Sequence, residues 1–333
     1  MDTNNNLLEI KDLYVHFKVY GGIMQVINGV DIEIKAGEKV GLVGESGCGK
    51  TTTVKSILKI FDKQATIPHG EINFDGKNVL KMNDKELHTL RGKDLSMIFQ
   101  DPTASLNPVF TIGEQMYDVI KYSGVVRKND KKRIKEIAIK ALKDCSMPDP
   151  IRILQNYPFQ LSGGMRQRVC IAMALATESR LLIADEPTTN LDVTIQDQVL
   201  KLIHRLVIEK GSSLILITHS LGVARETTDK IYVMYAGDIV EKSLTDEIFE
   251  NPLHPYTVGL LESIPKLTGE GMMSGIDGRL PNYLNPPKGC RFYPRCKFGT
   301  EECRDNKPPF YNITNEHKVA CFKYKNQNIV KGV

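Results

Sequence analysis

The sequence Lys39-Val-Gly-Leu-Val-Gly-Glu-Ser-Gly-Cys-Gly-Lys-Thr51 joins a short apolar run to a glycine-rich turn, and a helical pattern over residues 52–61 follows it. Glycines leave room for backbone amides to turn toward a phosphate group, and the positive end of the following helix adds to the attraction. A strand, a glycine-rich loop and a helix in this order form the context that the Walker A pattern requires. The stretch therefore predicts a nucleotide site inside an α/β domain.

Short apolar runs of the buried-strand type recur along the chain, at residues 95–99, 181–184 and 214–218, and helical patterns separate them. Residues 7–34 instead alternate apolar and polar side chains with a period of two, as strands with one buried face do. The alternation of strands and helices indicates an α/β core with parallel strands.

Two further regions differ from this core pattern. Residues 131–142 place apolar side chains on one helical face and lysines opposite, which predicts a helical subdomain over about residues 101–165. Beyond about residue 250 proline becomes frequent and the α/β pattern fades. We therefore predict a first domain over residues 1–250 and a C-terminal extension over residues 251–333.

The bulk composition is that of a globular protein, with 333 residues, 41% hydrophobic and 25% charged. A net charge of +4 is too small to argue for nucleic acid as a partner. The apolar runs are shorter than the roughly 18–20 residues that span a membrane, and the N-terminus lacks the pattern of a secretory signal. We expect a cytosolic chain whose membrane role, if it has one, comes through partners.

Four polar side chains are candidates for the chemistry at the nucleotide. Lys50 is placed to bridge the β- and γ-phosphates, and the Thr51 hydroxyl to ligate magnesium. Asp185 and Glu186 end a strand of the buried type, where the first carboxylate is placed to hold magnesium and the second to polarise the attacking water. Cys48 is interpreted as a small space-filling residue of the loop.

The segment Leu161-Ser-Gly-Gly-Met-Arg-Gln-Arg168 stands shortly before Leu181-Leu-Ile-Ala-Asp-Glu-Pro187. The pair resembles the signature sequence and the Walker B strand of the ATP-binding-cassette (ABC) ATPases. The resemblance covers residues 7 to about 325. It implies a P-loop ABC nucleotide-binding domain with an antiparallel β subdomain and an inserted helical subdomain, followed by a small cysteine-containing extension. It also implies that ATP and Mg²⁺ bind between two subunits, at the Walker A loop of one and the signature of the other.

The same resemblance assigns roles to single residues. Gln100 matches the glutamine that senses magnesium and water, His219 matches the histidine that contacts the γ-phosphate, and Asp192 matches a loop that crosses the dimer interface. Phe17 is the candidate for stacking on adenine, and Tyr20 is the alternative. The implied magnesium ligands are Thr51, Gln100 and Asp185. The other implied ATP contacts are Gly44, Ser46, Gly47, Cys48, Gly49, Lys50, Thr51, Thr52, Ser162, Gly163 and Gly164.

Within the family, the chain is similar to the ATPase subunits of oligopeptide/dipeptide permeases. The stretches that carry this similarity are Val43-Gly-Glu-Ser-Gly-Cys-Gly-Lys50, Phe99-Gln-Asp-Pro-Thr-Ala-Ser-Leu-Asn-Pro108, Asn251-Pro-Leu-His-Pro-Tyr-Thr257 and Leu260-Leu-Glu-Ser-Ile-Pro265.

The similarity implies import of dipeptides or oligopeptides at the cytoplasmic face of the membrane. The implied partners are a second ATPase subunit, two transmembrane permease subunits contacted through residues 101–114, and an extracytoplasmic substrate-binding protein. Importers with the same extension also carry nickel or other small solutes, which is the alternative cargo.

Two rival functions are less consistent with the sequence. ABC ATPases that act on ribosomes or DNA repair complexes usually carry two cassettes or a long coiled-coil insertion. We find neither feature here, nor a basic stripe studded with aromatic residues for nucleic acid. An exporter subunit is disfavoured by the His-Pro-Tyr stretch and by the cysteine-containing tail.

Cys290, Cys296, Cys303 and Cys321 are separated by five, six and seventeen residues. The spacing lacks the close Cys-x-x-Cys pairs that are common in zinc ribbons. Related permease ATPases carry a similar extension that holds a [4Fe–4S] cluster, which this resemblance implies here; zinc and an unligated cysteine core are the alternatives. We expect the flanking cations to stabilise the thiolate forms, and Cys145 and Cys170 to be buried apolar residues. The flanking cations are Arg291, Arg295, Lys297 and Arg304.

Overall fold

The computed structural model describes residues 6–61, 63–189, 191–263 and 275–326. The chain forms two compact units. The first combines Met1–Ile34, Lys39–Leu80 and Thr218–Val333, and the second combines Lys35–Glu38 and Lys81–Ile217. The domain boundary near residue 250 and the helical subdomain over about residues 101–165 stay predictions. Ile264 and Pro265, which end the last quoted permease stretch, lie outside the described residues.

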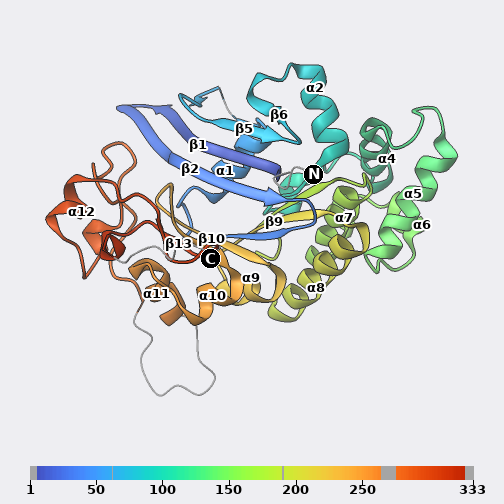
Figure 1. The fold of residues 1–333 in the computed structure, drawn as a ribbon. Coiled ribbons are helices and arrows are strands. Elements are labelled where there is room, and N and C mark those ends of the chain that lie inside the picture. Colours follow the sequence, from blue (N-terminus) through green and yellow to red (C-terminus); the bar gives the residue numbers. More distant parts are fainter. Residues whose placement is uncertain (1–5, 62, 190, 264–274, 327–333) are drawn as a thin grey trace. The chain divides into compact units, whose positions relative to one another are not determined.

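The first unit contains a sheet with the strand order β2-β1-β5-β6, in which β4 also pairs with β1 (Figure 1). Two long strands, β1 and β2, form much of this sheet, and β1 pairs antiparallel with β4 and β5. The sheet confirms the antiparallel β subdomain that the sequence implied. The strands are β1 Asn6–Val19, β2 Gly22–Lys35, β4 Ala65–Thr66, β5 Glu71–Phe74 and β6 Lys77–Asn78.

A second group of strands in this unit has the order β12-β13-β11-β10-β3. β3 is parallel to β10, whereas β11, β12 and β13 pair antiparallel with their neighbours. The turn from β10 to β11 consists of Ala236 and Gly237, both at positive φ, as a two-residue hairpin turn requires. These strands are β3 Lys39–Val43, β10 Lys230–Tyr235, β11 Asp238–Leu244, β12 Tyr311–Asn312 and β13 Lys318–Val319.

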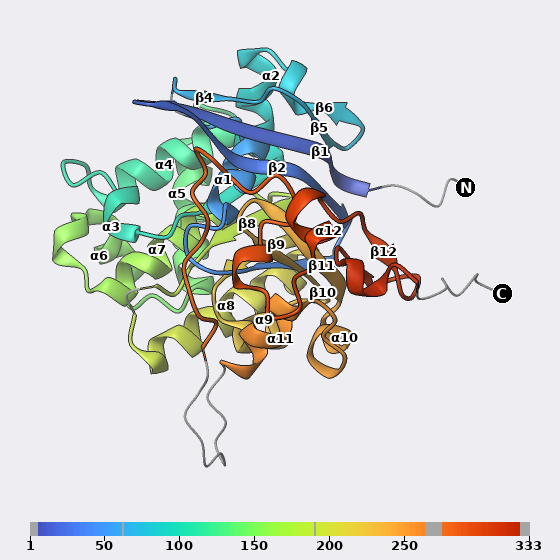
Figure 2. The same ribbon diagram turned by 90° about the vertical axis from the view of Figure 1, so that its left-hand side faces the viewer.

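The C-terminal segment is built into the core of the first unit. The rings of Tyr235 on β10 and Tyr256 on α11 lie 4.7 Å apart, and the Phe292 ring lies 5.0 Å and 5.5 Å from them. In Figure 2 the part of this segment that follows residue 275, in red, runs beside β11, with which β13 pairs. The helices of the unit are α1 Lys50–Ile57, η1 Val79–Lys81, α9 Leu221–Thr227, α10 Thr245–Glu250, α11 Pro255–Glu262, η4 Tyr293–Arg295, α12 Glu301–Asp305 and η5 Phe322–Tyr324.

The second unit contains the three parallel strands β7, β8 and β9, in the order β9-β8-β7. Every residue of β8 and β9 is buried, which explains their continuous apolar sequences. The parallel α/β core expected from the sequence is confirmed by these strands. They are β7 Leu95–Ile98, β8 Leu181–Asp185 and β9 Ser213–Thr218.

Helices make up most of the rest of the second unit, and α4, α5, α6 and α7 pack on one another (Figure 1). α5 begins where the sequence predicted, because Asp130 caps it by accepting a hydrogen bond from the Arg133 amide (3.0 Å). The helices are α2 Asp84–Thr89, η2 Leu90–Asp94, α3 Pro102–Ser105, α4 Ile112–Ser123, α5 Lys131–Asp144, α6 Pro150–Gln155, η3 Pro158–Gln160, α7 Gly163–Leu175 and α8 Val193–Lys210. Within the described ranges, no helix is both long enough and apolar enough to cross a membrane.

Candidate functional site

The glycine-rich loop lies between β3 and α1 of the first unit, and its geometry requires the glycines. Gly47 and Gly49 have φ angles of +84° and +113°, in the region that L side chains disfavour. At Gly44, an added Cβ atom would lie 2.2 Å from the main-chain oxygen of Met234. The loop conformation therefore depends on three glycines, two for their backbone angles and one for the space it leaves.

Lys50 follows this loop, and its side chain is buried. Its ammonium group donates hydrogen bonds to the main-chain oxygens of Gly44 (2.7 Å) and Glu45 (3.0 Å). The predicted ATP contacts of this region lie in the glycine-rich loop and in the first residues of α1. They are Gly44, Ser46, Gly47, Cys48, Gly49, Lys50, Thr51 and Thr52.

Three cysteines outside the C-terminal extension are buried, as predicted. Cys48 belongs to the glycine-rich loop and is buried, and burial raises the pKa of its thiol. Burial likewise raises the pKa of Cys145 and of Cys170 to about 12. These thiols stay protonated near neutral pH and fill space in the core.

Asp185 and Glu186 lie at the end of β8 in the second unit. Asp185 is buried, whereas Glu186 has a φ of +45°, which is uncommon for a residue with a side chain. Oε2 of Glu186 accepts hydrogen bonds from Nε2 of Gln100 (2.9 Å) and from the Thr189 hydroxyl (3.0 Å). The structure thus brings two of the predicted catalytic residues, Gln100 and Glu186, into direct contact.

The predicted signature residues form the start of α7. The Ser162 hydroxyl caps this helix by accepting a hydrogen bond from the Met165 amide (3.3 Å). An added Cβ atom at Gly163 would meet nothing within 4 Å, and one at Gly164 would lie 3.3 Å from the Ile195 side chain of α8. Asp192 caps α8 by accepting from the Ile195 amide (2.9 Å), so these residues gather at the N-termini of two neighbouring helices.

The remaining predicted ATP contacts belong to the first unit. His219 directly follows β9. Phe17 on β1 is partly buried, and its ring packs edge-on against Phe61 at 6.2 Å. Tyr20 is fully exposed at the turn that follows β1. The structure thus leaves both candidates for adenine stacking in place, one packed against a second ring and one in solvent.

The four cysteines of the extension line one hollow of about 310 Å³, named the cysteine hollow. Cys290, Cys296, Cys303 and Cys321 share this hollow with Phe292, Phe298 and His254, among others. Burial raises the pKa of the Cys290 thiol to about 12 and also raises the pKa of Cys296 and Cys321. Among the described residues, no group of three or more His, Cys, Asp or Glu side chains is arranged to hold a metal ion.

The expectation that the flanking cations stabilise these thiolates is contradicted for Arg291, Arg295 and Arg304, which bind other acceptors, and stays a prediction for Lys297. Arg291 donates to the main-chain oxygen of Ala236, and Arg295 pairs with Glu45 (3.0 Å). Arg304 pairs with the neighbouring Asp305 (2.9 Å). The guanidinium groups are engaged by other acceptors, and burial is the largest influence on the pKa of Cys290, Cys296 and Cys321.

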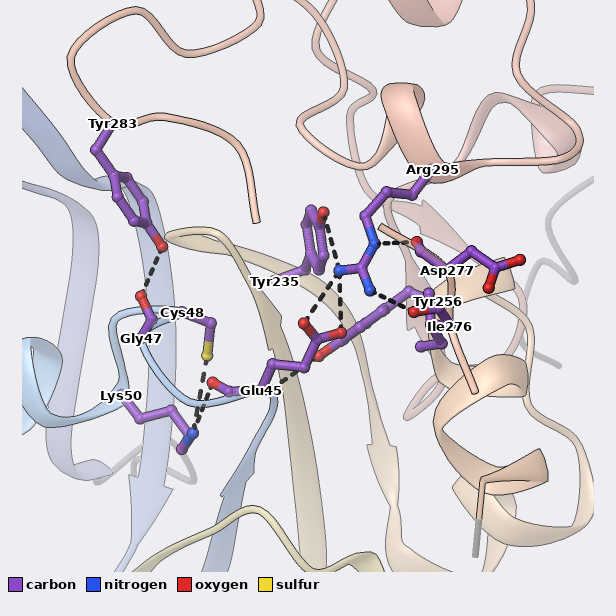
Figure 3. A network of polar contacts seen from close by, with 10 residues as sticks. All are labelled: Glu45, Gly47, Cys48, Lys50, Tyr235, Tyr256, Ile276, Asp277, Tyr283 and Arg295. Atoms are coloured by element: carbon purple, nitrogen blue, oxygen red, sulfur yellow. Dashed lines mark hydrogen bonds and ion pairs between the residues drawn. The ribbon is translucent and has the colours of Figure 1, made fainter. Parts of the chain in front are cut away.

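Three residues of the extension contact the glycine-rich loop, and the sequence did not single them out for this role (Figure 3). Tyr256 belongs to the quoted His-Pro-Tyr stretch, which was the only available signal. Arg295 was assigned to the cysteines, and Tyr283 lies in a segment without regular secondary structure.

Comparison with known families gives two matches. The profile of ABC transporters matches residues 27–189, which include the loop and the acidic pair. A second profile, the C-terminal region of oligopeptide/dipeptide transporters, matches residues 240–303. The oligopeptide transport ATP-binding protein OppD of Bacillus subtilis is 44% identical over 94% of this chain and 87% of that protein. The chain belongs to the ABC transporter family.

Other relatives agree with this assignment. OppD of Salmonella typhimurium is 42% identical over 96% of this chain and 94% of its own length. The dipeptide transport ATP-binding protein DppD of B. subtilis is 42% identical over 95% of this chain and 94% of its own length. The two-part organisation into an ABC ATP-binding domain and a permease-type C-terminal region is therefore confirmed.

Solved structures support the same fold. The dimeric ATP-binding cassette MJ0796 bound to ADP and Pi superposes with a TM-score of 0.64 at 27% identity, over 72% of this chain and 98% of that one. CbiO1 of Clostridium perfringens, part of the ABC transporter complex cbiONQ, gives a TM-score of 0.62 at 26% identity, over 74% and 92%. The predicted ABC nucleotide-binding fold is confirmed.

Proposed function

We propose that this chain is the ATP-hydrolysing subunit of an importer that carries dipeptides or oligopeptides across the cytoplasmic membrane, and that it lies at the inner face of that membrane. Relatives named as oligopeptide and dipeptide transport ATP-binding proteins align over nearly the whole chain. The observation that carries the catalytic part is the contact between Gln100 and Glu186 beside the buried Asp185. This arrangement suits a reaction in which a carboxylate must orient water.

The proposed reaction is hydrolysis of the terminal phosphoanhydride bond of ATP. Glu186 orients a water molecule and accepts its proton as the oxygen attacks the γ-phosphorus, and the bond to the bridging oxygen breaks to give ADP and phosphate. Lys50 exchanges its bonds to loop carbonyls for phosphate oxygens, and His219 contacts the γ-phosphate. The oxygen donors of Thr51, Gln100 and Asp185 suit Mg²⁺, which would supply neutralising charge.

A second ATPase subunit, identical or a sister chain, completes each ATP site in this proposal. Ser162, Gly163 and Gly164 offer a hydroxyl and the positive end of α7 to the ATP of the partner. The open space at Gly163 supports this role, because an approaching phosphate would meet backbone rather than side chain.

Exposed apolar residues of the second unit support contact with two transmembrane permease subunits. Val109 and Phe110 are 74% and 50% exposed within the segment predicted to make this contact, residues 101–114. A hydrogen bond from the Ile112 amide to the Asn156 main-chain oxygen (2.9 Å) joins this segment to a second one. The second segment carries exposed Phe159, three residues after Asn156. Exposed aromatic side chains of this kind favour a protein partner over water. An extracytoplasmic substrate-binding protein completes the proposed assembly, and nucleic acid has no part in it.

The catalytic proposal is tested by Glu186→Gln, assayed with the transporter partners present. We expect ATP hydrolysis to fall by about 10²–10⁴-fold while ATP binding persists, because glutamine keeps the shape but is not a base. Glu178→Gln is the matched control. Glu178 is an exposed glutamate at positive φ (+52°) shortly before β8, so its replacement controls for glutamine at this backbone conformation. Normal hydrolysis by Glu186→Gln would contradict the assignment.

The cargo is tested separately by uptake into vesicles that contain the whole transporter. ATP-dependent uptake of a labelled dipeptide or oligopeptide supports peptide import. Uptake of Ni²⁺ or another small solute, with none of peptide, would favour the alternative cargo while leaving the ATPase assignment intact.

In the same proposal, the cysteine hollow holds a [4Fe–4S] cluster on Cys290, Cys296, Cys303 and Cys321. The chemistry of the donor set supports this, because four thiols from separate parts of the extension line one cavity and thiolates are the usual cluster ligands, although the described side chains are not gathered around a single metal ion. A cluster is larger than a single ion and accepts thiolates that stand further apart. Since burial raises the thiol pKa, binding must displace protons. The proposed role is structural.

Anaerobic purification with iron and sulfide analysis tests the cluster. We expect about four irons and four sulfides per chain, lost in Cys303→Ser and retained in Cys170→Ala, whose thiol is buried in α7 and does not line the hollow. One zinc without sulfide would support the zinc alternative, and neither metal would support an unligated core.

A further inference from the structure

The glycine-rich loop is held by three side chains from beyond residue 250 (Figure 3). The Tyr256 hydroxyl accepts a hydrogen bond from the Glu45 amide (2.9 Å), and the Tyr283 hydroxyl donates one to the Gly47 main-chain oxygen (2.7 Å). Arg295 forms an ion pair with the Glu45 carboxylate. All three contacts lie within the first unit.

The two tyrosines fix the loop backbone at different points. Tyr256 is fully buried among the rings of Tyr235 and Phe292, so its hydroxyl has little freedom to move. Tyr283 bonds the carbonyl of Gly47, whose φ of +84° turns the loop. Because three of the six loop residues 44–49 are glycines, such external bonds limit conformations that the loop sequence by itself would allow.

Arg295 acts mainly through charge. Its Nη1 lies 3.1 Å and 3.0 Å from the two carboxylate oxygens of Glu45, while Nε and Nη2 donate to the main-chain oxygens of Asp277 (2.8 Å) and Ile276 (2.9 Å). The Arg295 side chain is only 5% exposed, so these bonds hold it in one orientation. It neutralises a carboxylate that belongs to the loop itself.

We propose that Tyr256, Tyr283 and Arg295 are positioning residues for ATP, which arrange the phosphate loop before the nucleotide arrives. The inference rests on the proposed function, because it takes this loop as the triphosphate site. An uncompensated Glu45 carboxylate would repel a triphosphate. A loop that is not held in place would have to become ordered when ATP binds, which would reduce the affinity. The C-terminal extension therefore contributes to nucleotide affinity in the same chain.

The first experiment compares Tyr283→Phe with Tyr324→Phe in the full-length chain. Tyr324 is the matched control, because it lies in the same extension and its hydroxyl also donates to a main-chain oxygen, that of Leu253 (2.9 Å), away from the loop. Equilibrium titration with ATP should show affinity about three- to tenfold weaker for Tyr283→Phe and unchanged for Tyr324→Phe. KM for ATP should rise by a larger factor than kcat falls.

The second experiment addresses charge. Arg295→Met should weaken ATP binding by about tenfold or more, because it leaves the Glu45 carboxylate uncompensated. Arg304→Met is the control, since Arg304 also stands next to a cysteine but pairs with Asp305 on the surface. Adding Glu45→Gln to Arg295→Met should restore part of the affinity, which a purely structural defect would not allow.

The outcomes distinguish failure of the proposed function from failure of the positioning role. A wild-type chain that does not bind ATP would overturn the proposed function itself. A wild type that binds ATP, together with unchanged affinity in Tyr283→Phe and Arg295→Met, would overturn only the positioning role. Equal losses in the variants and their controls, or no gain from Glu45→Gln in the Arg295→Met background, would also overturn it.

Discussion

Glu186 shows how the chain fixes a single side chain before any ligand is present. Its positive φ is unfavourable for glutamate, and such backbone conformations persist where the surroundings impose them. Its amide donates to the Ile217 main-chain oxygen (3.0 Å), and its carboxylate is held by Gln100 and Thr189. These contacts set the direction of a carboxylate that must orient water in the proposed reaction.

His254 is a second residue whose state the structure fixes. It is fully buried, and its Nδ1 accepts a hydrogen bond from the Tyr256 amide (3.1 Å), which caps α11. Nδ1 must therefore be unprotonated. Burial lowers the pKa of His254 from 6.5 to about 4, although the nearby Glu241 carboxylate opposes this shift. The histidine of the His-Pro-Tyr stretch is thus a neutral structural residue.

This environment predicts a specific loss of stability in acid. Because the folded pKa lies below the unfolded value, the unfolded chain binds a proton first as the pH falls from about 6.5 toward 4, and stability decreases. His254→Asn should keep the cap without titrating. From pH 7 to pH 5, the wild type should lose about 2 kcal/mol more unfolding free energy than His254→Asn, measured by urea titration.

The exposed His88 of α2 provides the control for the substitution itself, and His88→Asn is measured at the same two pH values. Parallel curves for the wild type and His254→Asn between pH 7 and pH 5 would show that His254 does not titrate as argued.

At the scale of elements, the sequence predicted the strands well because their apolar runs are continuous. The runs at residues 181–184 and 214–218 correspond to β8 and β9, each buried throughout. The first helix was predicted to reach residue 61 but ends at Ile57, where Lys59 adopts a positive φ of +51° that stops the helical path. Because no glycine follows this helix, its end was not visible in the sequence.

The contacts between elements could not be predicted in the same way. Tyr283 and Gly47 are 236 positions apart, and neither a motif nor a period connects them. The Walker A pattern identified the loop from local rules, because its glycines serve its own backbone angles. The side chains that hold this loop come from distant parts of the sequence and match no local pattern. They can be identified only from the way α11 and the segment after it pack in the structure.

At the scale of the whole molecule, the predicted ATP contacts are divided between the two compact units. The glycine-rich loop belongs to the first unit, together with the C-terminal extension that contacts it. The signature at the start of α7 and the acidic pair belong to the second. In the proposed dimer, the signature of one chain serves the triphosphate held by the loop of the other, so assembly and ATP binding depend on each other.

This dependence predicts that Gly163→Glu blocks ATP-driven dimerisation without preventing folding. An added side chain at Gly163 meets no atom within 4 Å, and an acidic residue at the start of α7 favours the helix. In the dimer, however, the carboxylate would face the triphosphate of the partner and repel it. Sedimentation with saturating ATP should show a dimer for Glu186→Gln and a monomer for Glu186→Gln combined with Gly163→Glu.

The comparison is made with the chain alone and with the chain mixed with the second ATPase subunit of its transporter. Lys131→Glu in the Glu186→Gln background is the control, because it places the same side chain at the exposed first residue of α5. That variant should still dimerise. At protein concentrations too low for dimerisation, the three proteins should bind ATP with similar affinity. Dimerisation of the Gly163→Glu protein as readily as its parent would mean that α7 does not face the triphosphate of a partner, since a carboxylate at that position could not be accommodated beside it.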